Sequence, residues 1–177
     1  YAHENGCEWH PDTTYYAADN GHLECLRYAH ENGCEWHPDT TYYAACNGHL
    51  ECLIYIYENC GDTATWDIET TIMAAEEGHL ECIRYAHENG CPWSPQTIQR
   101  AAQFGYLDIL KYAHENGCEW DPDTTRLAAE NGHLECLMYI YEKCGDVATW
   151  ENANLEEDPG EFSKEIRDYI NSVREDW

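Results

Sequence analysis

The sequence has few basic residues for its length. Lysine and arginine together number 9, against 35 aspartates and glutamates, and the formal net charge at pH 7 is −26. Because this charge repels a phosphate backbone, it disfavours sequence-independent nucleic-acid binding and favours partners with a basic protein surface. The alternative explanation is an acidic, solvated exterior that keeps an aromatic-rich chain in solution.

Long apolar runs and targeting signals are also missing. No stretch approaches the roughly 18 apolar residues that a membrane-spanning helix requires, and no signal-peptide pattern is visible. We therefore expect no membrane insertion. The chain starts at Tyr1, inside a repeated motif, and this position predicts that it belongs to a longer chain or complex.

Motifs of common catalytic sites are absent as well. The sequence contains no GxSxG, P-loop or dinucleotide-binding fingerprint. A histidine recurs in the motif GHL, but one repeat has Tyr106 in its place, which a catalytic base would not permit. The histidines are His22, His49, His79 and His133. We expect them to form hydrogen bonds between repeats, and we expect no enzymatic activity and no cofactor.

Eleven cysteines would indicate a disulfide framework in a short secreted chain. Their number is odd and most recur once per repeat, so we expect reduced, mostly buried thiols and a location in the cytoplasm or nucleus. His30 and Cys34 stand close in sequence at a helix end, a spacing that could ligate zinc. Because CxxC and HxxxH pairs are absent, we expect no metal site. A redox or metal-buffering protein is a rival interpretation.

One motif recurs along the chain at an almost constant spacing. The segment YAHENGC, or its variant YIYE(N/K)C, begins at Tyr1, Tyr28, Tyr55, Tyr85, Tyr112 and Tyr139. The step from each of these tyrosines to the next is constant, except for a slightly longer step between Tyr55 and Tyr85. Self-similarity at such a period indicates a stacked array, in which each repeat buries its apolar face against its neighbours.

Each repeat carries the signals of two helices. A proline is expected to open the first helix, where its missing N–H has no partner to lose. These prolines are Pro11, Pro38, Pro95 and Pro122. An alanine pair then allows close approach of a neighbouring helix, a glycine ends the helix, and the second helix starts at once with HLEC. The second helix ends in ENG, whose glycine is expected in the left-handed conformation: Gly6, Gly33, Gly90 and Gly117.

Two junctions are longer than the others. The segments 55–66 and 139–150 each carry a short insertion, CGDTAT or CGDVAT, so the repeats follow the order A-A-B-A-A-B. The steps from Tyr1 to Tyr85 and from Tyr55 to Tyr139 are equal, which indicates a block of three repeats used twice. We expect the two longer loops on the same edge of the array. Residues 1–150 are thus predicted to form half a repeat plus five full repeats.

The repeat pattern stops after Trp150. Residues 151–177 are predicted to form an acidic linker followed by a helix, with its start at Asp158–Glu161. The apolar stripe of this helix is Phe162, Ile166, Tyr169, Ile170 and Val173. A cap with a polar outer face is the favoured interpretation, because the last repeat would otherwise expose its flank. A peptide-like helix for a partner is the alternative.

Residues 13–36, TTYYAADNGHLECLRYAHENGCEW, resemble ankyrin repeats in their alanine pair, GH and NG(A/C) motifs. The resemblance covers nearly all of residues 1–150 and implies an all-α, right-handed solenoid of stacked helix-turn-helix repeats. The repeats here have about 27 residues, whereas ankyrin repeats have about 33 residues. The missing residues imply that the projecting hairpin finger is absent. Short repeats of this kind are similar to arrays in protists, algae and large DNA viruses, some of them joined to an F-box, and no F-box is visible here.

Two positions of the first helix vary most among the repeats. They stand one helical turn apart, hence on one face, and their change in residue type indicates a surface rather than a core. Ankyrin-like arrays line their concave side with first helices, so the resemblance implies that this face binds a partner; an indifferent solvated face is the alternative. The predicted partner-binding residues are Tyr15, Asp19, Tyr42, Cys46, Ile72, Glu76, Gln99, Gln103, Arg126 and Glu130. Exposed tyrosines at Tyr15 and Tyr42 would favour contact.

The sequence therefore predicts a non-enzymatic module or scaffold for protein–protein interaction, with a basic protein as its partner. A structural subunit that is permanently packed in a larger assembly is the second interpretation.

Overall fold

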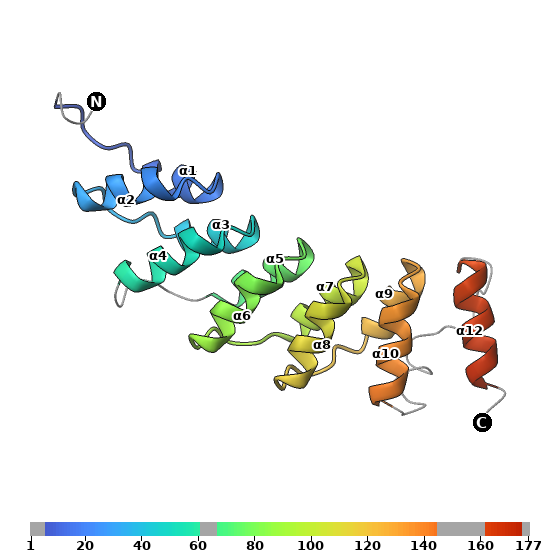
Figure 1. Ribbon diagram of the computed structural model, residues 1–177. Coiled ribbons are helices and arrows are strands. Elements are labelled where there is room, and N and C mark those ends of the chain that lie inside the picture. The colour runs from blue at the N-terminus through green and yellow to red at the C-terminus, as the bar shows by residue number, and fades with distance from the viewer. Residues whose placement is uncertain (1–5, 61–66, 145–161, 175–177) are drawn as a thin grey trace. The chain divides into compact units, whose positions relative to one another are not determined.

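Short helices joined in pairs make up the part of the protein that the computed structural model describes, residues 6–60, 67–144 and 162–174 (Figure 1). The first helices of the pairs are α1 (Thr13–Asp19), α3 (Thr40–Cys46), α5 (Ile68–Glu76), α7 (Pro95–Phe104) and α9 (Thr124–Glu130). The second helices are α2 (Leu23–Glu31), α4 (Leu50–Cys60), α6 (Leu80–Glu88), α8 (Leu107–Glu115) and α10 (Leu134–Cys144). Helix α12 (Lys164–Arg174) follows. Across these ranges no strand is present, so the all-α prediction is confirmed.

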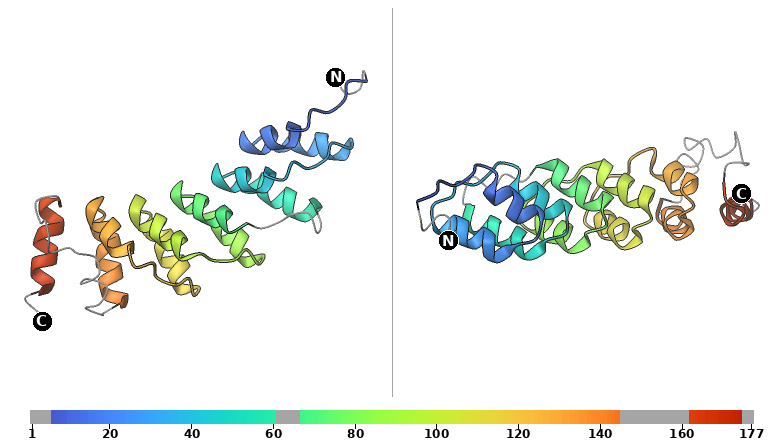
Figure 2. Two further views of the ribbon diagram at one scale, coloured as in Figure 1. Left: turned by 180° about the vertical axis from the view of Figure 1, so that it is seen from behind. Right: turned by 90° about the horizontal axis from the view of Figure 1, so that it is seen from above.

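The chain divides into two units, residues 1–93 and 94–177. In the first unit α1, α3 and α5 lie side by side in one layer, and α2, α4 and α6 lie side by side in a second (Figures 1 and 2). In the second unit α7 lies beside α9, α8 lies beside α10, and the two layers pack on each other in the same way. Stacked helix-turn-helix repeats, as predicted, therefore form each unit.

The GH motif makes the turn between the two helices of a pair. Gly21 has a φ of 67°, and the N–H of His22 reaches back to the carbonyl of Ala17 at 2.8 Å. This left-handed turn pairs the last carbonyls of α1 and lets α2 begin immediately. A Cβ at Gly21 would stand 2.5 Å from Nδ1 of His49, so the histidine of the next repeat packs directly on the glycine.

The NGC motif repeats the same turn at the end of the second helix. Cys34 N–H donates to the carbonyl of Ala29 at 2.9 Å, and Gly33 has a φ of 82°. The side-chain amide of Asn32 adds a hydrogen bond to the carbonyl of Tyr28 at 2.8 Å. The left-handed conformation is confirmed at Gly6, Gly33, Gly90 and Gly117, with φ of 85°, 82°, 90° and 86°.

The core runs between the two layers of each unit. The alanine pairs are buried, as at Ala44 and Ala45, which are both fully shielded from solvent. Branched apolar side chains of the second helices fill the facing layer, and Leu53 and Leu137 are both 0% exposed. Small residues on one layer and large ones on the other allow the helices of a pair to approach closely.

The first helices start later than the prolines predict, except in α7. Helix α7 begins at Pro95, where Ser94 Oγ accepts the N–H of Gln96 at 3.2 Å. Helices α1, α3 and α9 begin shortly after their prolines, at Thr13, Thr40 and Thr124. There a tight turn precedes the helix, as where the N–H of Thr40 bonds to the carbonyl of His37 at 3.1 Å. The residue before the proline still caps this turn, since His37 Nδ1 accepts the N–H of Asp39 at 3.2 Å.

The cysteine positions follow the depth of each helix in the stack. Cys52, Cys82 and Cys136 are buried as predicted, and so are Cys34, Cys91 and Cys118. The expectation is wrong for Cys7 and Cys25, which are exposed. Within the described residues, α2 contacts one neighbouring second helix, α4, whereas α4 contacts both α2 and α6. Both exposed cysteines precede α3, Cys7 in the segment before α1 and Cys25 on α2.

Helix α12 begins at Lys164, and Ser163 Oγ accepts the N–H of Ile166 at 3.3 Å. The predicted start at 158–161 and the two longer junctions, 61–66 and 145–150, lie outside the described residues. The apolar stripe is confirmed: Phe162, Ile166, Ile170 and Val173 are buried, and Tyr169 is half-buried.

The ring of Tyr169 places α12 relative to α10. Tyr169 meets Tyr141 edge to face at 6.2 Å and 87°, and in the first unit Tyr85 meets Tyr57 at 5.9 Å and 89°. Helix α12 thus contacts α10 through these rings as α6 contacts α4, and its role as a cap stays a prediction. Of the helices described here, none has both the length and the apolar character that a bilayer crossing requires.

Candidate partner-binding surface

Six of the predicted binding residues lie on the neighbouring first helices of the first unit, and we call them the ridge: Tyr15, Asp19, Tyr42, Cys46, Ile72 and Glu76. Asp19 accepts a hydrogen bond from Asn47 Nδ2 of the next repeat at 3.1 Å. Burial raises the pKa of the Cys46 thiol, and the carboxylates of Glu77, Asp19 and Glu76 raise it further. The structure therefore brings together side chains from three successive repeats.

The ridge residues differ in exposure. Tyr15 and Tyr42 are half-buried, and Tyr15 packs edge to face on Tyr43, with ring centroids 4.6 Å apart. Ile72 is 4% exposed, so the expectation that every variable position lies outside the core is wrong there. An aliphatic side chain gains free energy by leaving water, and residue type alone does not report that depth. Among the described residues the most exposed tyrosine is Tyr16, at 56%, which sequence reasoning missed.

An acidic cavity opens beside Tyr42, and we call it the Tyr42 pocket. It has a volume of about 430 Å³ and is lined by Asp39, Tyr42, Tyr43, Asp67, Glu69 and Thr70. Burial raises the pKa of Tyr42, with nearby charges on Glu69 and Glu76 adding to the shift. In the sequence, the only sign of this pocket was an acidic residue at the start of each of two successive first helices. The two walls of the pocket come from different repeats, so that sign did not reveal the pocket.

The second unit carries the other four predicted residues on α7 and α9. Arg126 forms ion pairs with Glu130 at 2.9 Å and with Asp123 at 3.1 Å. Hydrogen bonds to these two carboxylates raise the pKa of Arg126. Gln99 Nε2 donates to Asp121 Oδ1 at 3.1 Å, and Gln103 Oε1 accepts from Arg100 at 2.8 Å. The polar groups of this surface are therefore largely paired within the chain.

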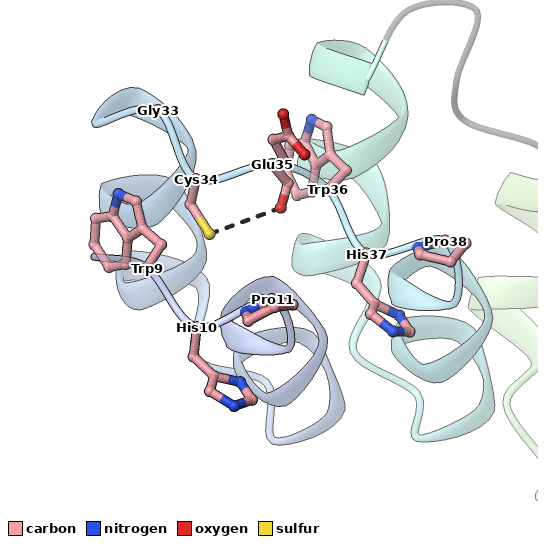
Figure 3. A pocket seen from close by; sticks show the side chains of 9 residues that line it. All are labelled: Trp9, His10, Pro11, Gly33, Cys34, Glu35, Trp36, His37 and Pro38. Atoms are coloured by element: carbon pink, nitrogen blue, oxygen red, sulfur yellow. Dashed lines mark hydrogen bonds between the residues drawn. The ribbon is translucent and has the colours of Figure 1, made fainter.

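Two of the tryptophans lie in loops that precede first helices (Figure 3). Trp9 and Trp36 stand on successive loops with Cys34 between them, around a cavity of about 470 Å³. Trp9 Nε1 donates to the carbonyl of Asn32 at 3.1 Å, and Trp36 stacks on His30 at 4.7 Å. The Trp9 contact joins neighbouring repeats, and Trp36 packs on the end of the helix that precedes it in the chain. Trp66 and Trp150 lie outside the described residues.

The histidines have structural partners. His49 Nε2 lies 3.1 Å from the carbonyl of Asp19, a contact between repeats of the kind expected for the GHL histidine. His30 Nδ1 lies 2.9 Å from the hydroxyl of Tyr55, while the thiol of Cys34 points to the carbonyl of Glu35. The His30 ring and the Cys34 thiol thus engage different groups, although their spacing resembles that of a zinc-ligand pair.

The buried thiols are poor nucleophiles. Burial raises the pKa of Cys52 and Cys136 to about 11, and that of Cys82 and Cys91 to about 12. Since the thiolate is the reactive form, these side chains act as small apolar groups. Across the described part of the chain, no three His, Cys, Asp or Glu side chains group as a metal site.

The family comparison agrees with this architecture. Residues 14–97 match the family model for ankyrin repeats, in three copies. A search of curated proteins found no significant match. Ankyrin repeats are typically non-catalytic modules that bind other proteins. Residues 14–97 of the chain are therefore similar to ankyrin repeats.

Proposed function

We propose that this protein is a non-enzymatic recognition module that binds a basic protein partner through its first helices. The observation that carries the proposal is the ridge of the first unit, where tyrosines and carboxylates of three repeats form one surface. The ankyrin repeats supply the general role of protein binding. The acidic and aromatic residues of the ridge indicate the chemistry of the partner.

The charge distribution favours a basic partner. By sequence, Arg27 and Arg84 are the only lysines or arginines in residues 1–93, and both lie on second helices. The first-helix layer of this unit therefore carries acidic residues without a lysine or arginine of its own. Such a field accelerates association with a positively charged surface and weakens as salt screens it.

Capture from cell extract on the immobilised chain, followed by affinity measurement with the recovered protein, tests this proposal. Replacing Asp19 and Glu76 by Asn and Gln should weaken binding and reduce its salt dependence. The matched control replaces Glu51 and Glu58 by Gln, which removes the same charge from exposed positions of α4. If both double variants weaken binding equally, the ridge has no special role.

A structural subunit in a larger assembly is the second candidate. It is favoured by apolar side chains exposed in the second unit, Phe104 at 41% and Met138 at 47%. Permanent interfaces are more apolar than the rest of a protein surface. Light scattering at low and high salt separates the candidates, because an apolar self-association persists at high salt, whereas a recognition module stays monomeric.

The remaining details are part of the same proposal. We place the protein in the cytoplasm or nucleus and regard its repeats as a short variant without the hairpin finger. The loops at residues 34–39 and 118–123 contain no strand, which supports that variant. The free thiols of the described cysteines support the intracellular location.

A further inference from the structure

We propose that the Tyr42 pocket receives a cationic side chain, lysine or arginine, from a bound protein. This inference deepens the proposed function, on which it rests for the source of the cation. The pocket itself is a distinct cavity of about 430 Å³ between the starts of α3 and α5.

Two tyrosines form the aromatic side of the pocket. Tyr42 and Tyr43 meet at 84° with ring centroids 4.9 Å apart, and Tyr15 contacts Tyr43 edge to face at 4.6 Å. Both pocket tyrosines are half-buried, so their rings keep accessible area. The face of an aromatic ring carries negative potential and attracts ammonium and guanidinium groups within about 6 Å.

Three carboxylates form the acidic side, and they are not neutralised by the chain. Asp39, Asp67 and Glu69 are exposed. Asp67 Oδ1 accepts the N–H of Glu69 at 3.2 Å, while the carboxylates of Asp39 and Glu69 have no hydrogen bond or ion pair with any described residue. The arginines of this unit are engaged elsewhere, Arg27 near Glu24 at 3.7 Å and Arg84 near Glu81 at 3.9 Å.

A buried hydroxyl adds an independent indication. Thr70 lines the pocket, is 1% exposed, and its Oγ1 has no hydrogen-bond partner among the described residues. Buried polar groups in folded proteins are normally hydrogen-bonded. An ammonium or guanidinium that enters the cavity brings the N–H donors that this oxygen lacks.

The second block of repeats carries a cation at the position of Tyr42. In the second block of three repeats, Arg126 occupies the position that Tyr42 has in the first block, and Asp123 occupies the position of Asp39. There the arginine pairs with Asp123 at 3.1 Å. The first unit keeps the aspartate but has a tyrosine in place of the arginine, so Asp39 has no such ion pair within the described residues.

Titration of the full chain with small amides tests the pocket without a protein partner. The probes are N-acetyl-lysinamide, N-acetyl-argininamide and the uncharged N-acetyl-norleucinamide, followed by the ring resonances of Tyr42 and Tyr43 in NMR spectra. We expect saturable shifts with the two cations and none with norleucinamide. Tyr42→Ala should weaken cation binding about two- to fivefold.

A second pair of variants separates charge from folding. Asp39→Asn with Glu69→Gln changes exposed side chains, so the fold should remain and the cation shifts should diminish. Glu51→Gln with Glu58→Gln is the control and should leave the shifts unchanged. Equal shifts with norleucinamide would overturn the proposed cation site. Full cation binding by the Asp39→Asn, Glu69→Gln variant would overturn it as well.

The outcomes also distinguish this inference from the proposed function. If a partner binds through the ridge while the amides produce no saturable shift, the pocket is refuted and the function stands. If the amides bind as expected but ridge variants do not affect the partner, the proposed surface is refuted and the pocket stands.

Discussion

The two units have closely similar second helices and differ more on their first helices. Residues 28–36 and 112–120 are identical in sequence. Their contacts match as well: His30 lies 2.9 Å from the hydroxyl of Tyr55, and His114 lies 2.9 Å from that of Tyr139. A cation also covers the tyrosine ring in each, Arg27 at 5.4 Å and Lys111 at 5.7 Å.

The ridge positions, in contrast, have changed their chemistry. Tyr15 and Tyr42 of the first unit correspond to Gln99 and Arg126 of the second, at the same places in the repeated block. The second helices and turns fix the spacing of the stack, so a change there disturbs two neighbours. The ridge positions of the first helices vary more between the units, and their differences can encode what each unit binds.

The largest expected effect concerns the shared core. Leu53 and its counterpart Leu137 are both 0% exposed. Replacing either by alanine leaves a cavity and should lower the free energy of unfolding by about 4 kcal/mol. Chemical denaturation measures this loss. Markedly unequal losses in the free energy of unfolding would show that the cores of the two units are not equivalent.

The reactivity of the thiols on α4 and α10 provides a second comparison of the two units. The pKa of Cys52 and Cys136 is raised to about 11, so at mildly alkaline pH each holds about a hundredfold less thiolate than an ordinary cysteine. Both should react equally slowly with a thiol reagent, and their rates should rise with pH. Cys25, exposed on α2, is the internal control. Mass spectrometry of the labelled chain gives each rate, and rapid labelling of Cys136 alone would break the equivalence.

The sequence predicted most of the stack because its signals act locally. Glycine at a helix end reports a positive φ, so Gly33 and Gly90 were placed correctly. The predicted start of α3 at Pro38 was too early, because proline marks the first turn and a tight turn precedes the helix there.

The candidate site was predicted less completely, because it is assembled across repeats. Ile72 varies like a surface residue yet is buried, since its depth depends on neighbouring helices. Asp39 and Glu69 share the Tyr42 pocket although they belong to successive repeats of the sequence. Each lies at the start of a different first helix, and the sequence does not report how far apart those starts lie.

The GH turns should show a smaller but equally matched effect. A Cβ at Gly48 would stand 2.4 Å from Nδ1 of His79, and one at Gly105 would stand 2.4 Å from Nδ1 of His133. Gly48→Ala and Gly105→Ala should each cost about 2 kcal/mol, from the left-handed backbone and the displaced histidine. Gly33→Ala meets no atom within 4 Å and should cost about 1 kcal/mol, the backbone contribution alone. Thermal unfolding would contradict this account if Gly33→Ala were the most damaging.

The smallest effect belongs to the surface on which the units differ. Arg126→Ala removes two partly exposed ion pairs and should lower stability by about 0.5 kcal/mol at low salt, with no loss at high salt. Tyr42→Ala at the equivalent position removes ring packing instead, so its effect on stability should not depend on salt. Unfolding of the two variants over the same series of salt concentrations measures this contrast. Identical salt dependence of the two stability losses would contradict it.

The central claim is that the ridge of the first unit, rather than the second helices and turns that the two units have in common, recognises the partner. The most direct test gives the first unit the residues of the second, Tyr15→Gln with Tyr42→Arg, and measures affinity for the captured partner by calorimetry. The second unit already has glutamine and arginine at the equivalent positions of its own first helices. The melting temperature of the double variant should therefore stay close to that of the parent chain. The account predicts at least about a tenfold loss of affinity. Unchanged affinity in the folded double variant would contradict it.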